Sequence, residues 1–185
     1  MGRMAISLSF TAGWLASFAA GAQSLSCPET PFLRDGFEPA PTAPQPGTFD
    51  QRAGFDLINC ARAQVVPAAV PPLEPLAWSA TIAADAQVRA NTCSTEFDLS
   101  NGYGQVFVSG TLGGSPIRTA VEQLVALRLQ YDYASNTCTS GLACRNYTQL
   151  VWRPATQAAC AFAPCGGGLV WCFFDRIQNF SVRPW

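Results

Sequence analysis

Eight cysteines are the residues of this chain whose type and spacing point most directly to chemistry. They could ligate a metal ion or pair as disulfides. None of them forms a Cys-x-x-Cys pair, the spacing typical of a closed tetrahedral zinc site. An even number of cysteines in an exported chain is typical of a disulfide framework, which we therefore expect here. The cysteines are Cys27, Cys60, Cys93, Cys138, Cys144, Cys160, Cys165 and Cys172.

Two residue types that carry out much enzyme chemistry are missing. The chain has no histidine, and all 11 of its basic residues are arginines, so it has no lysine either. It cannot build a Ser-His-Asp or Cys-His catalytic site, a P-loop, a pyridoxal Schiff base or a His-Glu-x-x-His zinc site. Only carboxylates, tyrosines and serines remain for proton transfer, and we expect no enzymatic activity.

The first residues are typical of a secretory signal peptide. Arg3 precedes an apolar run over residues 4–18, and Ala20-Gly21-Ala22 supplies a small-x-small cleavage site. The alternative is a membrane anchor, but the run is shorter than the roughly 20 residues that span a bilayer. We expect residues 1–22 to be a signal peptide and the protein to be secreted and extracellular, or periplasmic or at the cell surface in a bacterium, with no integral membrane segment.

The remaining chain divides into an arm and a domain. Residues 23–49 are rich in proline and show no periodicity, which predicts an extended arm, and residues 50–185 form the domain. Apolar residues at three-and-four spacing predict helices over 50–65, 79–91 and 115–131. Short aromatic or β-branched runs predict strands over 147–152, 158–162 and 169–174. Helices followed by hairpin-linked strands indicate an α+β layered fold.

Residues 144–153, Cys-Arg-Asn-Tyr-Thr-Gln-Leu-Val-Trp-Arg, resemble the signature of the CAP superfamily (SCP/TAPS, pathogenesis-related class one type). In that signature a histidine precedes Tyr-Thr-Gln-x-Val-Trp, and the matching residues here are Tyr147, Thr148, Gln149 and Trp152. Shorter matches, such as Leu76-Ala77-Trp78-Ser79 and Tyr103-Gly104-Gln105, extend the resemblance over about residues 50–185. It implies an α-β-α sandwich of CAP type, with an antiparallel sheet between helices and disulfide bracing.

Many CAP proteins carry two histidines and two glutamates in a cleft that can hold a divalent metal. The resemblance places these four positions at Asp98, Gln105, Leu127 and Asn146. Amide oxygens are weak zinc ligands and leucine supplies none, so we expect no metal and no other cofactor. We expect Gln105 and Asn146 to bond each other or nearby backbone, and Leu127 to pack into the core.

The resemblance also implies how the cysteines pair. In this family pattern Cys93 joins Cys165, Cys138 joins Cys144, and Cys160 joins Cys172. Cys27 and Cys60 are then left for each other. Such a pairing would tie the proline-rich arm to the domain and leave no free thiol.

Three classes of function stay open. The resemblance favours an extracellular module that binds a sterol, a fatty acid or a protein partner, with the glycine-rich loop over residues 106–115 as a flexible lipid gate. A defence or structural protein without a small-molecule ligand cannot be separated from this by sequence, and a hydrolase is disfavoured by the missing histidine.

Because the arginines are scattered and the net charge is −1, we expect no nucleic-acid partner. Any ligand is expected to be apolar and insensitive to salt.

Overall fold

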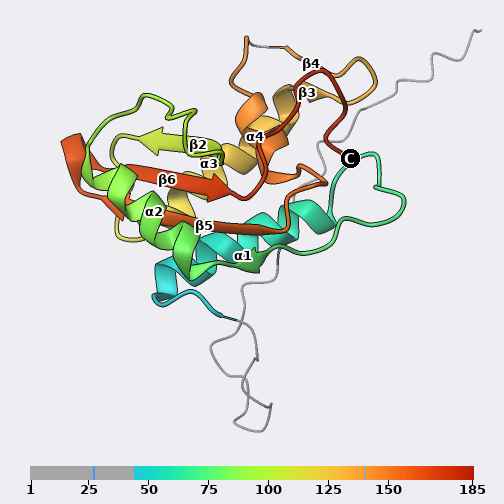
Figure 1. Cartoon of the computed structure of the whole chain (residues 1–185). Coiled ribbons are helices and arrows are strands. Elements are labelled where there is room, and N and C mark those ends of the chain that lie inside the picture. The colour runs from blue at the N-terminus through green and yellow to red at the C-terminus, as the bar shows by residue number, and fades with distance from the viewer. Residues whose placement is uncertain (1–26, 28–43, 140) are drawn as a thin grey trace, which may run out of the picture.

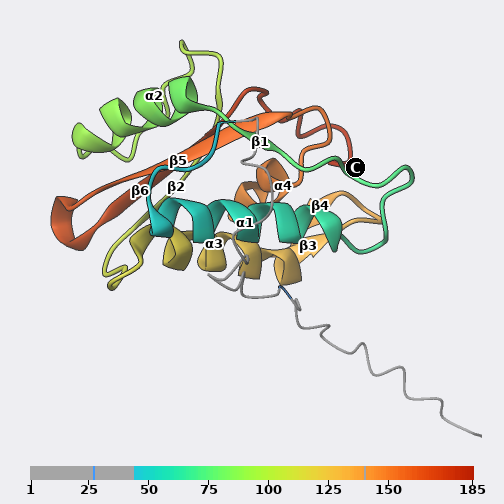
Figure 2. The same cartoon turned by 90° about the horizontal axis from the view of Figure 1, so that it is seen from below.

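The computed structural model describes Cys27 and residues 44–139 and 141–185, so the predicted signal peptide and most of the proline-rich arm lie outside the described residues. The described chain forms three layers (Figure 1, Figure 2). Helix α2 (Ala80–Asn91) covers one face of a sheet, and α1 (Phe49–Ala63) and α3 (Pro116–Ala126) lie on the other side. This arrangement is the expected α+β sandwich.

The main sheet has four strands in the order β1-β5-β6-β2. Their bounds are β1 Ala77–Trp78, β2 Gly104–Ser109, β5 Gln157–Ala163 and β6 Leu169–Phe174. Strand β1 runs parallel to β5 and the other pairs are antiparallel, so the expected antiparallel sheet carries one short parallel strand at its edge. Two residues carry too little pattern for a strand to be predicted. A separate small sheet pairs β3 (Tyr131–Asp132) with β4 (Thr137–Cys138).

The helices begin at local signals. Thr48 and Gln51 form a capping box at the start of α1, and the Ser79 hydroxyl accepts from the backbone N–H of Ile82 at the start of α2. Pro116 is the first residue of α3. The third predicted helix was too long, because α3 ends at Ala126 and a 3₁₀ turn, Leu127–Gln130, leads into β3. Its apolar spacing continues past the point where the backbone leaves the α conformation.

Two segments differ from their predicted structure. Residues 147–152 were predicted as a strand, but helix α4 (Arg145–Leu150) covers most of them. Its residues from Tyr147 to Leu150 are all buried, and a run this short has no periodicity that distinguishes a buried helix from a strand. Residues 106–115 were predicted as a flexible loop, but β2 occupies 104–109 and pairs along its whole length with β6. The prediction of a flexible lipid gate is therefore wrong for residues 106–109.

Four disulfides brace the layers. They are Cys27–Cys60, Cys93–Cys165, Cys138–Cys144 and Cys160–Cys172, the pairings that the resemblance implies. Cys93 follows α2 and its bond crosses to the turn between β5 and β6, while Cys160 and Cys172 face each other on those two strands. Among the described helices, none has both the length and the hydropathy required to cross a membrane.

Candidate functional site

The signature residues of α4 hold the C-terminal segment against the domain. Thr148 donates from Oγ1 to Oε1 of Gln178 at 2.8 Å. The side chain of Gln149 donates to the carbonyl of Arg176 at 3.0 Å and accepts from the backbone N–H of Gln178 at 3.0 Å. Tyr147 is buried, and its ring lies edge-on to Trp185. These contacts give the signature a structural role in this chain.

The four positions that the resemblance assigns to metal-binding residues separate into a close pair and two others. Gln105 on β2 accepts from the backbone N–H of Asp98 at 3.2 Å and donates to the Asp98 carbonyl and to Oδ1 of Asn101 at 2.9 Å. Leu127, at the start of the 3₁₀ turn, is partly buried against the core. Asn146 lies on α4, and in the described part of the chain its side chain makes no hydrogen bond with Gln105.

The side chains at these positions do not fit a zinc ion. The Gln105 amide is engaged in holding the loop that carries Asp98, and one Asp98 carboxylate oxygen accepts from the Ser100 backbone and hydroxyl. Within the described ranges, three or more His, Cys, Asp or Glu side chains do not gather in any cluster that could hold a metal. Zinc prefers nitrogen, sulfur and carboxylate ligands, and this set supplies a single carboxylate.

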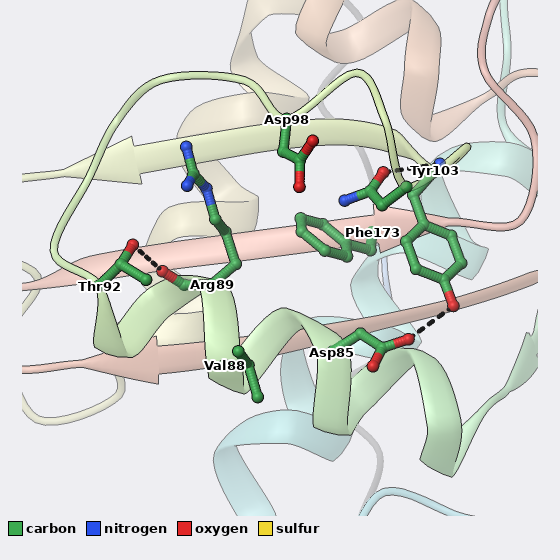
Figure 3. Close-up of a pocket in the computed structure, with 8 residues that line it drawn as sticks. Asp85, Val88, Arg89, Thr92, Asp98, Tyr103 and Phe173 are labelled. Atoms are coloured by element: carbon green, nitrogen blue, oxygen red, sulfur yellow. Dashed lines mark hydrogen bonds between the residues drawn. The ribbon is translucent and has the colours of Figure 1, made fainter.

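A pocket of about 390 Å³ opens between α2 and the segment that leads into β2 (Figure 3). We call it the α2–β2 pocket; it is lined by Asp85, Val88, Arg89, Thr92, Asp98, Asn101, Tyr103 and Phe173. The Phe173 ring lies between Asp98 above and Asp85 below in this view. The Tyr103 ring packs on it with centroids 5.4 Å apart, and the Tyr103 hydroxyl donates to Oδ2 of Asp85 at 2.7 Å.

Hydrogen bonds set the charge of the pocket. Those from the Ser100 side chain and backbone lower the pKa of Asp98, and the positive charge of Arg89 adds to this, so the carboxylate is ionised at neutral pH. The bond to Asp85 and partial burial raise the pKa of Tyr103, which stays a neutral phenol. The Arg89 guanidinium already has partners within the protein. It lies 5.3 Å above the Trp171 ring and donates to the Ser94 hydroxyl and the Glu96 carbonyl.

Of the pocket residues, sequence reasoning singled out only Asp98. Asp85, Arg89 and Phe173 come from α2 and β6, and nothing in the spacing of residues so far apart indicates that they meet. The one available signal was the match at Tyr103-Gly104-Gln105, which places Tyr103 directly before β2.

Comparisons with known proteins agree with this fold. Residues 55–175 match the model of the CAP family, described as the cysteine-rich secretory protein family. The chain is 36% identical over 135 residues to pathogenesis-related protein 1A of Nicotiana tabacum, covering 70% of this chain and 77% of that protein. It is 33% identical over 137 residues to a PR-1 type pathogenesis-related protein of Sambucus nigra, covering 70% of this chain and 78% of that protein.

Solved structures show the same fold at lower identity. The venom allergen-like protein 4 of Schistosoma mansoni superposes with a TM-score of 0.60 at 23% identity, covering 75% of this chain and 94% of that one. NaASP2, solved with Zn²⁺, superposes with a TM-score of 0.56 at 21% identity, covering 74% and 85%. On the family match and the plant relatives, this chain belongs to the CAP family of cysteine-rich secretory proteins.

Proposed function

We propose that this chain is an extracellular binding protein without catalytic activity, and that its ligand occupies the α2–β2 pocket. Four disulfides support the extracellular location, because such bonds persist in oxidising compartments and are rare in the cytosol. The N-terminal pattern of residues 1–22 supports export along the same route.

The protonation states in the pocket argue against catalysis. Efficient general acids and bases have pKa values near the working pH. Here the pKa of Asp98 is lowered and that of Tyr103 is raised, so both groups move away from neutrality.

The observation that carries the binding proposal is the aromatic wall of the pocket. Tyr103 presents a partly exposed ring, which is tilted by 32° against the buried ring of Phe173 behind it, and the exposed Val88 stands at the rim. The volume of about 390 Å³ lies at the small end of the range of roughly 300–1,000 Å³ for ligand pockets. It therefore suits a ring-sized apolar group, from a small molecule or from a side chain of a protein partner. A fatty-acid carboxylate would be repelled by Asp98.

A neutral ring compound tests this proposal. We expect 2-phenylethanol, titrated into the disulfide-bonded protein, to shift the amide NMR signals of α2 and of residues 98–105. Val88→Ser removes apolar contact and should weaken binding about threefold. Val70→Ser is the matched control, because Val70 is a 91% exposed valine outside the pocket. Signals that move neither with this compound nor with a charged ring compound of the same shape, or equal effects of the two variants, would contradict the proposal and favour a structural or defence role without a ligand.

Export has its own test. Expressed in a secreting host, the protein should begin at Gln23, after the predicted cleavage site. Its intact mass should rise on full reduction by the eight hydrogens of four disulfides. A different N-terminus would contradict the cleavage site, and a thiol that alkylates without reduction would contradict the pairing.

A further inference from the structure

The α2–β2 pocket has two carboxylates on opposite sides of one ring. Asp85 stands on α2 and Asp98 on the facing loop, with Phe173 between them (Figure 3). Each carboxylate has one oxygen engaged, Oδ2 of Asp85 by Tyr103 and Oδ1 of Asp98 by Ser100. No donor among the described residues reaches the second oxygen of either group. Both carboxylates therefore keep hydrogen-bonding capacity for a ligand.

The single cation of the pocket does not neutralise this pair. The Arg89 guanidinium points away from Asp85 in Figure 3, toward the loop that follows α2. There it donates to the Ser94 hydroxyl and the Glu96 carbonyl and lies over the Trp171 ring. Two carboxylates against one arginine leave the pocket with a net negative charge, concentrated at the end where Tyr103 and Asp85 meet.

Aromatic rings and carboxylates together select one kind of group. A cation is attracted to the face of a tyrosine ring, here the partly exposed Tyr103 packed on the buried Phe173, and to the unused carboxylate oxygens beside it. We infer that the α2–β2 pocket binds an organic cation, an ammonium or guanidinium group carried on a ring-sized apolar body, between Asp85 and Asp98. The inference rests on the proposed function, since it names the chemistry of the ligand that this pocket holds.

Two other kinds of ligand, a divalent metal ion and an organic anion, fit the site less well. A bare divalent ion needs more strong ligands than two carboxylates set apart by a phenylalanine ring. An anionic ligand would face both carboxylates, while Arg89 is already bonded to the loop. The organic cation could come from a free amine or from a cationic side chain of a partner protein, because both carry a positive charge on an apolar body.

Three probes of one shape and different charge test the inference by NMR titration at neutral pH. They are 2-phenylethylammonium, 2-phenylethanol and phenylacetate. We expect the ammonium to bind about fivefold more tightly than the alcohol, from partly exposed ion pairs and ring contact, and phenylacetate to bind most weakly. The advantage of the ammonium should shrink in high salt, since exposed charges are screened.

Variants that remove one carboxylate charge test whether Asp85 and Asp98 bind the ammonium group. Asp98→Asn and Asp85→Asn should each weaken ammonium binding about threefold and weaken alcohol binding less. Asp132→Asn is the control for Asp98, because Asp132 is an aspartate whose Oδ1 also accepts from the backbone of the residue two positions on, but it is exposed and lies outside the pocket. N-acetyl-phenylalanyl-arginine amide distinguishes the sources. Tighter binding of this peptide than of the amine indicates a partner side chain, and the reverse order indicates a free amine.

The outcomes separate the two proposals. Equal affinity for all three probes, or no loss in Asp98→Asn and Asp85→Asn, would overturn the cation inference and leave the pocket as a neutral apolar site. Failure of every probe to bind would overturn the proposed function as well.

Discussion

Arg62 on α1 donates from Nη1 to the carbonyl oxygen of Leu150, the last residue of α4, at 3.1 Å across 88 positions of sequence. The same guanidinium donates to the carbonyls of Glu74, Trp152 and Ala155. It is 1% exposed, and burial lowers its pKa to about 10, so it remains charged at neutral pH. Carbonyls at a helix C-terminus have no partners within the helix, and Arg62 supplies the donors.

Replacing Arg62 should destabilise the fold strongly. Arg62→Met keeps much of the volume but leaves several buried carbonyls without a donor, which should lower the free energy of unfolding by about 3 kcal/mol or more. Arg62→Lys should also destabilise, since a compact ammonium cannot span the same fork of acceptors. Denaturant unfolding with disulfides intact measures both. Arg52→Met, an exposed arginine on the same helix, should change stability by under about 0.5 kcal/mol; an equal loss there would contradict this role for Arg62.

Gly104 should not tolerate a side chain. A Cβ at this position would lie 2.5 Å from Oε1 of Gln149 and would also collide with the Arg176 carbonyl. Gly104→Ala should therefore cost about 1–3 kcal/mol, the usual range for overpacking, and should loosen the contact between α4 and residues 176–178. Gly114→Ala is the matched control, because no atom lies within 4 Å of its Cβ position. Comparable stability of the two variants in denaturant would refute the steric argument.

Zinc should not stabilise this protein. A ligand that binds only the native state at a hundred times its dissociation constant adds about 2.7 kcal/mol, which would raise Tm by several degrees in a domain of this size. Because the resemblance assigns the metal-ligand positions to residues such as Gln105, Leu127 and Asn146, which are poor zinc ligands, we expect the same Tm with micromolar zinc and with chelator. A rise in Tm that chelation reverses would reveal a metal site.

Alkaline pH should weaken the fold through Tyr147. Burial raises the pKa of Tyr147 well above its ordinary value of 10.0, so the folded state holds the neutral phenol while the unfolded chain ionises. This contribution is fully present below pH 10 and is lost as pH rises above it. The free energy of unfolding of the wild type should fall more steeply than that of Tyr147→Phe, by about 1.4 kcal/mol per pH unit. Parallel curves above pH 10 would contradict the burial argument.

Local signals made the helices predictable. The Ser79 cap, Pro116 at the start of α3 and the apolar spacing of α1 each act within a turn or two of backbone, so they appear in the sequence itself. The resemblance supplied the disulfide partners, since spacing alone leaves many pairings open. The same resemblance assigned Gln105 and Asp98 to one cleft, but it could not show that the Gln105 amide holds the loop that carries Asp98.

Short buried segments were the least predictable. The run from Tyr147 to Trp152 has the composition of a strand, yet its first four residues are helical because α4 packs against α3 and β2. Val106 to Ser109 lies before a glycine-rich stretch, and only its pairing with β6 makes it a strand. In both cases the partner element decides the backbone conformation, and propensity within a few residues is too weak to oppose it.

The sequence by itself determined the family, the three longest helices and the exclusion of histidine- and lysine-dependent chemistry, because composition, motif and capping are properties of consecutive residues. Only the tertiary structure decided that Asp85, Tyr103 and Phe173 surround one pocket and that Arg89 is turned toward Trp171. A pocket exists where elements distant in sequence fail to fill the space between them, and that depends on how helix and sheet pack in three dimensions.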